Sequence, residues 1–257
     1  MVDIHCHILP GLDDGPATLA ESVEMAKAAI ADGITHVVAT PHSNDRFKFE
    51  PELIRARREE LQELAGEKLQ LATGCDFHMN VENLRDLRKT PSRFTINQKN
   101  YLLVEFADFV IPAQLDDVLK EMLMNGVTPV ITHPERNPVL RSKPQRLAEW
   151  VNQGCFVQVT AHSLLGKFGQ SAQIAAEKWL EEDAIHFIAS DAHNLKSRPL
   201  QLKEAFELVA RKRGKPVAEA LFRENPLAAF EGQPLPYVPE PKEAAAEPPP
   251  KKKFLFF

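Results

Sequence analysis

The sequence predicts one α/β domain whose parallel strands close into a barrel. Short apolar runs alternate with amphipathic helical stretches along most of the chain. Nearly continuous apolar character is typical of strands buried on both faces of a parallel sheet. Six or seven such strand–helix units favour a barrel over a four-strand layer. The length of 257 residues and the 44% hydrophobic content suit one large domain, or two small ones.

Seven apolar runs are expected to form the strands. Most of them are rich in Val and Ile, and each is too short to be a helix. The expected strands are residues 2–4, 34–39, 69–73, 101–104, 128–131, 155–159 and 186–189.

Helix signals fill the segments between these runs. Thr18 and Glu21 have the spacing of a capping box, and Gly33 follows as a stop signal. Later helices begin at Pro in the first turn and end at Gly126 or Gly154. The expected helices are residues 18–32, 51–65, 81–89, 112–125, 144–153, 170–183, 199–213 and 216–223.

Composition excludes several classes of protein. The net charge of −5 argues against a nucleic-acid partner. No apolar run approaches the roughly 20 residues of a membrane span, and the start does not have the pattern of a signal peptide. The three cysteines, Cys6, Cys75 and Cys155, are an odd number without a pairing pattern and fit a reducing, cytoplasmic compartment. None of them is followed by five residues and an Arg, which argues against a thiolate phosphatase.

Residues 232–257 differ from the rest of the chain. They contain seven of the twenty prolines, an Ala/Glu patch, three lysines at 251–253 and the aromatic end at 254–257. This composition predicts a disordered tail after a domain of residues 1–231. The basic and aromatic end could dock on a partner or a membrane, or have no role.

Metal-ligating side chains follow six of the seven runs. His5 and His7 are two apart, so a strand would present both on one face. In parallel α/β folds, ligands bind at the carboxyl ends of the strands, where these side chains would converge. Five histidines and four carboxylates make up the set: His5, His7, Asp14, His42, Asp76, Glu105, His133, Asp191 and His193.

Divalent cations give a physical reason for this cluster. Carboxylates so close together would raise one another's pKa, and cations remove that repulsion. Nitrogen and oxygen donors without thiolate suit Mn, Fe, Co or Zn, and nine donors are enough for three ions. The other four histidines, His36, His78, His162 and His186, are expected to be structural, with His78 closest to the cluster.

Five motifs in this order resemble the polymerase-and-histidinol-phosphatase superfamily. More narrowly, they are similar to its bacterial manganese-dependent protein-tyrosine phosphatases of capsule and exopolysaccharide loci. The resemblance covers about residues 2–230. The motifs are His5-x-His7, Asp13-Asp14-Gly15-Pro16, Thr40-Pro41-His42, Thr132-His133-Pro134-Glu135-Arg136 and Ser190-Asp191-Ala192-His193-Asn194.

This resemblance implies a distorted (β/α)7 barrel with three metal ions, most simply Mn²⁺. The first ion would use His5, His7, Asp76 and Asp191; the second Asp76, Glu105 and His133; the third Asp14, His42 and His193. The family usually has Glu at the position of Asp76, so the implied bridge is one methylene shorter here.

The implied reaction is hydrolysis of phosphotyrosine by a metal-bound hydroxide. Arg136 and Arg198 would bind the phosphate, although either could instead be a surface ion pair. The segment 44–50, with two aromatic and two cationic residues, could stack the tyrosine ring or pack as a lid. The implied partner is a phosphotyrosine protein, such as a membrane-associated tyrosine kinase. A small-molecule phosphoesterase, such as a histidinol-phosphate phosphatase, and a metal-binding regulatory module without turnover remain alternatives. The oligomeric state is open.

Overall fold

The computed structural model describes residues 1–239 and confirms the parallel α/β barrel. Two sheets form it, with strand orders β1-β2-β4 and β3-β5-β6-β7-β8-β9, and every strand pair is parallel. The strands are β1 Val2–Cys6, β2 His36–Ala39, β3 His42–Ser43, β4 Gln70–Thr73, β5 Asp76–His78, β6 Tyr101–Glu105, β7 Thr128–Thr132, β8 Phe156–Thr160 and β9 Phe187–Ala189.

Two of the expected strands are bent rather than straight. The run expected at 34–39 contains β2, which resumes as β3 after Thr40 and Pro41, and β4 likewise resumes as β5 after Gly74 and Cys75. Each bend moves the chain from one sheet to the other. When each bent pair is counted as one strand, seven strands surround the centre, which is the distortion of the barrel.

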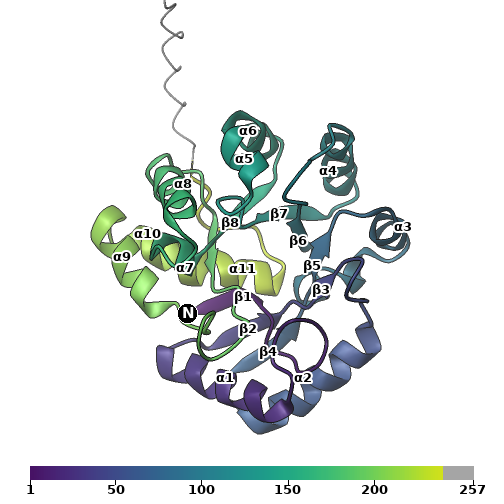
Figure 1. Cartoon of the computed structure of the whole chain (residues 1–257), viewed down its shortest axis with the longest axis vertical. Coiled ribbons are helices and arrows are strands. Elements are labelled where there is room, and N and C mark those ends of the chain that lie inside the picture. Colours follow the sequence, from purple (N-terminus) through teal and green to yellow (C-terminus); the bar gives the residue numbers. More distant parts are fainter. Residues whose placement is uncertain (240–257) are drawn as a thin grey trace, which may run out of the picture.

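Helices surround the strands, as Figure 1 shows. Their positions confirm the expected helices, although the one expected from residue 199 begins only at Lys203. The helices are α1 Leu19–Asp32, α2 Pro51–Ala65, α3 Val81–Lys89, α4 Gln114–Met124, α5 Pro138–Ser142, α6 Pro144–Asn152, α7 Ala161–Leu164, α8 Gln170–Glu181, α9 Lys203–Arg213, α10 Lys215–Glu219 and α11 Asn225–Glu231. Within residues 1–239, none has the length and apolar character needed to cross a membrane.

Three short helices were not expected from the sequence: α5, α7 and α11. Each has few residues, so hydrophobic periodicity gives little signal for it. A five-residue π-helical turn, Ala220–Glu224, also links α10 to α11. Two 3₁₀ turns, Pro91–Arg93 and Ile96–Gln98, precede β6, and the second contacts both β4 and β6.

The inside of the barrel is apolar at its amino-terminal end. Val2, Ile4, Val38 and Leu103 belong to one buried cluster there, together with Ala229 of α11. Figure 1 shows α11 lying across the ring of strands. A separate and larger apolar cluster packs the helices against the outside of the sheets. The amino-terminal end is therefore filled and covered, and the open end is the carboxyl one.

The segment after α11 corrects the predicted start of the tail. Tyr101 donates a 2.7 Å hydrogen bond from its hydroxyl to the Gln233 carbonyl. Asn225 donates to the Tyr237 carbonyl at 2.7 Å and accepts from the Tyr237 amide at 3.0 Å. Residues 233–237 are thus held against the barrel, which proline content alone did not indicate. The rest of the predicted tail, with its basic and aromatic end, lies outside the described residues.

Candidate metal centre

All nine predicted ligands lie together at the carboxyl ends of the strands. Their donor atoms make four overlapping groups, and within each group the atoms lie within 4.8 Å of one another. The groups are His7, Asp14, His42 and His193; His5, His7 and Asp76; His5, His133 and Asp191; and His42, Asp76 and Glu105. Asp76 belongs to two of these groups.

An irregularity in β1 allows His5 and His7 to face the centre. Val2 and Ile4 belong to the inner apolar cluster, so strict alternation would turn His5 to the opposite face. The register of β1 with β2 shifts between Asp3 and Cys6, which is the place where alternation is broken. The sequence showed the spacing of the two histidines, but it did not show this shift.

Three histidines are oriented by oxygen atoms that can only accept hydrogen bonds. The Nδ1 atom of His5 lies 2.9 Å from the Gln158 amide oxygen, and that of His7 lies 2.7 Å from an Asp13 carboxylate oxygen. The Nδ1 atom of His193 lies 3.0 Å from the Asp191 carbonyl. Each Nδ1 therefore carries a proton, which leaves Nε2 as the ring atom that can bind a metal once it is deprotonated.

The arrangement of these Nε2 atoms fits a cation. The Nε2 atoms of His5 and His7 face each other at 3.4 Å. Asp76 is fully buried and neither of its carboxylate oxygens has a well-directed hydrogen bond, although the His42 Nδ1 lies 3.0 Å from one of them. Buried carboxylates in this position are normally paired or coordinate a metal. The donor set therefore fits divalent ions, and the donors are nitrogen and oxygen only.

The carboxylates do not all behave as mutual repulsion would predict. Burial alone would raise the pKa of Asp191, but the charges of His5 and Arg136 hold it well below its usual range. Burial and the neighbouring charge of Asp76 do raise the pKa of Glu105. The expected repulsion between carboxylates is thus seen at Glu105. At Asp191 the positive charges of His5 and Arg136 outweigh it.

Neighbouring carboxylates favour the protonated form of two histidines in the centre, His42 and His5. Burial would lower the pKa of His42, but its contacts with Asp14 and Asp76 raise it to about 11. Burial likewise opposes protonation of His5, yet Asp191 and Asp76 raise its pKa to about 9. Metal binding at these nitrogens must therefore release protons.

Two of the five non-glycine residues with positive φ among residues 1–239 lie in the centre. His133 and Asp191 have φ values of 33° and 52°, a region that few residues other than glycine adopt. Gly15 is required by close packing, because a Cβ there would lie 2.5 Å from the His7 carbonyl. Such strain at candidate ligands is typical of functional sites held in place by the surrounding fold.

Arg136 and Arg198 lie at the edge of the centre, where both donate hydrogen bonds to the same Asp191 oxygen. Their guanidinium carbons lie 4.4 and 5.6 Å from the ring centre of Phe168, in the loop after α7. Sequence reasoning missed Phe168, since its only local signals are the flanking Gly166 and Gly169, both with positive φ. It also missed Gln158 and did not assign Asp13 its role beside His7.

The segment 44–50 combines the two expected arrangements. The ring of Phe47 stacks with His42 at a centroid distance of 6.0 Å, so it lies beside the candidate ligands. Phe49 instead stacks with Phe94 at 4.9 Å and packs against the barrel. The segment is anchored by one aromatic residue and presents the other to the centre.

The remaining histidines and the cysteines lie as follows. His36 contacts Phe230 and His186 contacts Phe156, both at the amino-terminal end. His78 lies at the centre, with its Nδ1 3.6 Å from Glu105. His162 is buried, and its Nε2 has no hydrogen-bond partner. The free cysteines are Cys6, Cys75 and Cys155; all three are buried and their pKa values are raised by burial, which disfavours a thiolate.

Comparison with known proteins identifies relatives along most of the chain. Residues 1–231 match the family described as capsular polysaccharide synthesis, CpsB/CapC. The tyrosine-protein phosphatase YwqE of Bacillus subtilis is 36% identical over 218 residues, which is 83% of this chain and 85% of YwqE. CpsB of Streptococcus pneumoniae, also named a tyrosine-protein phosphatase, is 32% identical over 88% of this chain and 96% of its own.

Solved structures agree with these relatives. A structure from work on YwqE and CpsB, described there as unique metal-dependent tyrosine phosphatases, superposes with a TM-score of 0.87. It is 34% identical in sequence and covers 95% of this chain and 100% of the other. A β-aspartyl dipeptidase of Fervidobacterium islandicum, 17% identical with a TM-score of 0.58, covers 90% of this chain and 74% of its own and shares the fold alone. This chain belongs to the CpsB/CapC family of capsular polysaccharide synthesis.

Proposed function

We propose that this protein is a metal-dependent protein-tyrosine phosphatase that hydrolyses phosphotyrosine on a protein. The observation that carries the proposal is the convergence of nine nitrogen- and oxygen-donor side chains beside two arginines at one end of the barrel. The tyrosine-protein phosphatases among its relatives support the choice of substrate.

Three divalent ions, with Mn²⁺ the first choice and Fe, Co or Zn the alternatives, would occupy the centre. Such ions would lower the pKa of a water molecule bound to them towards neutral pH and would stabilise negative charge on a phosphoryl group. Asp14, His42 and His193 would hold one ion, since they form one of the compact groups. Asp76 would bridge the other two, as its place in two groups allows.

The two ions that would share Asp76 need further ligands. His5, His7 and Asp191 would complete the first ion's ligands beside Asp76, and their Nε2 and carboxylate atoms lie within 3.4 Å of each other. Glu105 and His133 would complete the ligands of the other ion; a Glu105 oxygen lies 3.7 Å from the His133 Nε2.

Arg136 and Arg198 would bind the phosphoryl oxygens of the substrate. Both guanidinium groups share one Asp191 oxygen in the metal-free chain. If the Asp191 carboxylate bound a metal ion, it would accept weaker hydrogen bonds from the two arginines. A phosphate could then accept paired hydrogen bonds from each guanidinium group. Phe47, beside His42, is positioned to contact the tyrosine ring.

The substrate protein is proposed to be a tyrosine kinase of polysaccharide export, associated with the membrane. The family name supports this choice, because it connects the chain with capsular polysaccharide synthesis. Three buried cysteines without disulfides support a reducing, cytoplasmic location.

Chelation and reconstitution test the proposal directly. The purified protein is analysed for metals and assayed on a phosphotyrosine peptide, before and after treatment with a chelator and then with Mn²⁺. We expect the chelator to abolish phosphate release and Mn²⁺ to restore it. A chelated, metal-free protein that keeps full activity would overturn the metal mechanism.

Two further measurements separate the alternatives. A variant with Cys6, Cys75 and Cys155 all changed to Ser should retain substantial turnover if it still binds metals, because no thiolate takes part. Histidinol phosphate assayed on the same preparation distinguishes a small-molecule phosphoesterase. Metal-loaded protein inactive on every phosphoester would instead indicate a regulatory module.

A further inference from the structure

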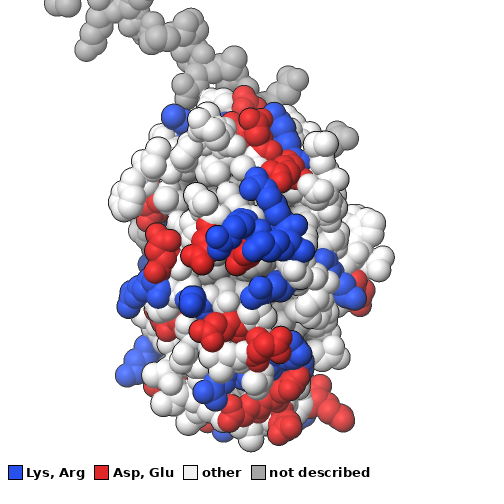
Figure 2. Space-filling model, turned by 90° about the vertical axis from the view of Figure 1, so that its right-hand side faces the viewer, with Lys and Arg blue, Asp and Glu red and all other residues white. Residues whose placement is uncertain are grey.

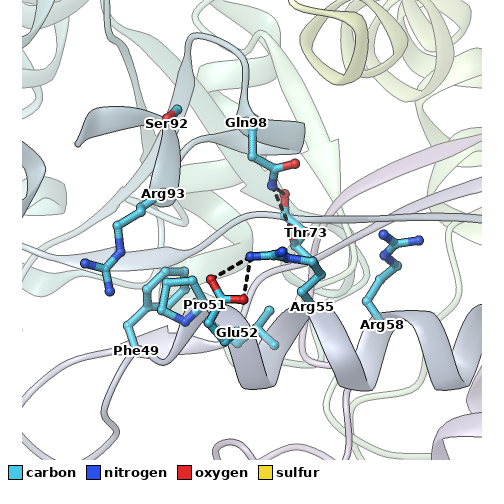
Figure 3. A pocket seen from close by; sticks show the side chains of 10 residues that line it. Phe49, Pro51, Glu52, Arg55, Arg58, Thr73, Ser92, Arg93 and Gln98 are labelled. Carbon is cyan, nitrogen blue, oxygen red and sulfur yellow. Dashed lines mark hydrogen bonds and ion pairs between the residues drawn. The ribbon is translucent and has the colours of Figure 1, made fainter.

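An arginine-lined cavity lies away from the metal centre, between α2 and the turns that precede β6. Its volume is about 660 Å³, and Arg55, Arg58 and Arg93 line it together with Thr73 and Gln98. Figure 3 shows these side chains, with Arg55 and Arg58 rising from α2 and Arg93 on the opposite side. The cavity lies beside Thr73, the last residue of β4, and Gln98 of the 3₁₀ turn that contacts β4.

The positive charge of this cavity is only partly neutralised. Glu52 is the one carboxylate among its lining residues, and both of its oxygens accept hydrogen bonds from Arg55, at 2.6 and 2.7 Å. The nearest carboxylate oxygen to Arg58 belongs to Glu59 and lies 3.6 Å away. For Arg93, no ion pair within 4.0 Å exists among residues 1–239. The guanidinium groups of Arg93 and of Arg58, which has only the 3.6 Å contact with Glu59, can therefore still donate hydrogen bonds to an anion, in a protein whose net charge is −5.

A second hollow lies between this cavity and the strand β3 that carries His42. It has a volume of about 690 Å³, shares Phe49 and Arg93 with the arginine-lined cavity, and reaches Ser43, the residue after His42. The stack of Phe49 on Phe94 forms part of its wall. Figure 2 shows the face that carries α3, where basic side chains gather at mid-height. This second hollow carries charges of both signs, with Asp45, Glu50, Glu82 and Asp86 facing it beside Arg46 and Lys48. An extended peptide that starts beside His42 and passes Phe49 would therefore meet an excess of positive charge only at Arg93 and Arg58.

We propose that the cavity lined by Arg58 and Arg93 binds a second negatively charged group of the substrate chain, separate from the phosphotyrosine. A carboxylate or a phosphate would satisfy it, because both accept paired hydrogen bonds from a guanidinium group. The inference rests on the proposed phosphatase function and adds a preference for acidic substrate segments. It also predicts that this preference weakens as salt concentration rises.

The test uses the full-length protein and three peptides that differ only at their distal end. Each carries one phosphotyrosine, followed by two Gln, two Glu or one phosphoserine. The set of three is repeated for several spacings between the phosphotyrosine and the distal residues. For the wild-type protein we expect kcat/KM to be roughly two- to fivefold higher for the charged peptides, the range that exposed ion pairs give. The Glu and phosphoserine arms show which anion the cavity prefers.

Variants then locate the effect. In Arg58→Gln with Arg93→Gln, the advantage of the charged peptides should disappear, while kcat/KM for the Gln peptide stays unchanged. Arg57→Gln is the matched control, since Arg57 is on the same helix, outside the cavity, and pairs with Glu60 at 3.1 Å. A wild-type protein without preference, or a preference that survives in the double variant, would overturn the proposal.

A binding measurement separates this proposal from the proposed phosphatase function. The chelated protein is titrated with a fluorescent, unphosphorylated form of the Glu peptide, and anisotropy reports binding. Binding that the double variant loses and Arg57→Gln retains supports the cavity even in a protein inactive on phosphotyrosine. No binding by the wild-type protein, or equal binding by the double variant, counts against the cavity whatever the activity.

Discussion

Asn225 and Asp76, two fully buried residues at opposite ends of the barrel, differ in how their polar atoms are paired. At the amino-terminal end, Asn225 makes three hydrogen bonds, to the carbonyls of His186 and Tyr237 and from the Tyr237 amide. At the carboxyl end, neither oxygen of Asp76 has a well-directed hydrogen bond, and one of them lies 3.0 Å from the His42 Nδ1. A satisfied polar group stabilises a fold, whereas an unsatisfied one costs free energy unless a ligand completes it.

Strained backbone occurs at both ends, but its setting differs. At the closed end, Asn97 and Gln98 have positive φ values in the 3₁₀ turn that packs on α11, and the Asn97 side chain donates to the Phe230 carbonyl. At the open end, the positive φ values of His133 and Asp191 belong to candidate ligands. Strain at the open end therefore coincides with the side chains proposed to bind ions, as is typical of functional sites.

The largest expected effect concerns Asp76. We expect Asp76→Ala to lose more than one metal ion per chain and to reduce kcat by roughly a thousandfold or more, because it removes the carboxylate proposed to bridge two ions. Asp76→Asn should also fail, since it keeps the size and removes the charge. Asp76→Glu should retain the metals and much of the activity. Metal analysis and kcat across the three variants measure this.

The control for Asp76 is a carboxylate outside the centre. Asp86→Ala removes a partly exposed residue of α3 that pairs with Lys89, and should leave metal content and kcat unchanged. Should Asp76→Ala keep its full metal content, Asp76 is not the bridge. His78, which lies beside Glu105, then becomes the next candidate.

The next effect concerns the closed end. Truncation after Glu231 removes three side-chain hydrogen bonds, one between Tyr101 and Gln233 and two between Asn225 and Tyr237, besides two backbone hydrogen bonds at the end of α11. We expect the free energy of unfolding to fall by about 3 kcal/mol, at about 1 kcal/mol for each side-chain hydrogen bond. Truncation after Pro239 is the control and should change it little. Equal stability of the two truncated proteins in urea denaturation would show that residues 232–239 do not stabilise the barrel.

The candidate ligands were predictable because their signal is local. A His, Asp or Glu directly after an apolar run is placed at the carboxyl edge of the sheet by the strand itself, as for Glu105 and His133. The alternation of runs and helices likewise determined the barrel. No knowledge of distant contacts was needed for either prediction.

Features that depend on long-range packing were not predictable. Gln158 orients His5 across a separation of 153 residues, and Asn225 is matched by a carbonyl 39 residues away. The register shift in β1 depends on how it pairs with β2. The positive φ of His133 and Asp191 is imposed by the surrounding fold, since neither residue type specifies it.

A smaller effect follows from the protonation of His186 at the closed end. Burial lowers its pKa to about 4, below the value of 6.5 expected when unfolded. Because the unfolded chain binds the proton more tightly, this group's contribution is present above pH 6.5 and is lost as pH falls towards 4. At pH 4.5 the loss should be about 2.5 kcal/mol.

The variant His186→Asn isolates that contribution. Its amide oxygen can accept the Val157 N–H that His186 Nδ1 now accepts at 3.2 Å, without a titrating group. The difference in unfolding free energy between wild type and variant, measured by urea denaturation, should shrink by about 2.5 kcal/mol between pH 7 and pH 4.5. Groups at the open end titrate in both proteins and cancel. A difference that does not change with pH would contradict the assignment.

The smallest expected effect concerns Phe168, which contacts both arginines at the open end. Its ring lies 4.4 Å from the Arg136 guanidinium carbon and 5.6 Å from that of Arg198. Cation–π contacts at exposed sites contribute about 0.5–1 kcal/mol each. Phe168→Ala should therefore raise KM for a phosphotyrosine peptide, and the inhibition constant of inorganic phosphate, by roughly fivefold, with metal content unchanged.

Two variants test whether Phe168 acts through the arginines. Phe168→Trp keeps an aromatic face for both guanidinium groups and should restore KM, whereas Phe168→Leu keeps bulk alone and should not. Phe109→Ala is the matched control, because Phe109 is 91% exposed and lies in another loop, the one after β6. Rescue by Leu as well as by Trp would show that Phe168 only fills space. An unchanged inhibition constant for phosphate in Phe168→Ala would show that the two arginines need no aromatic support.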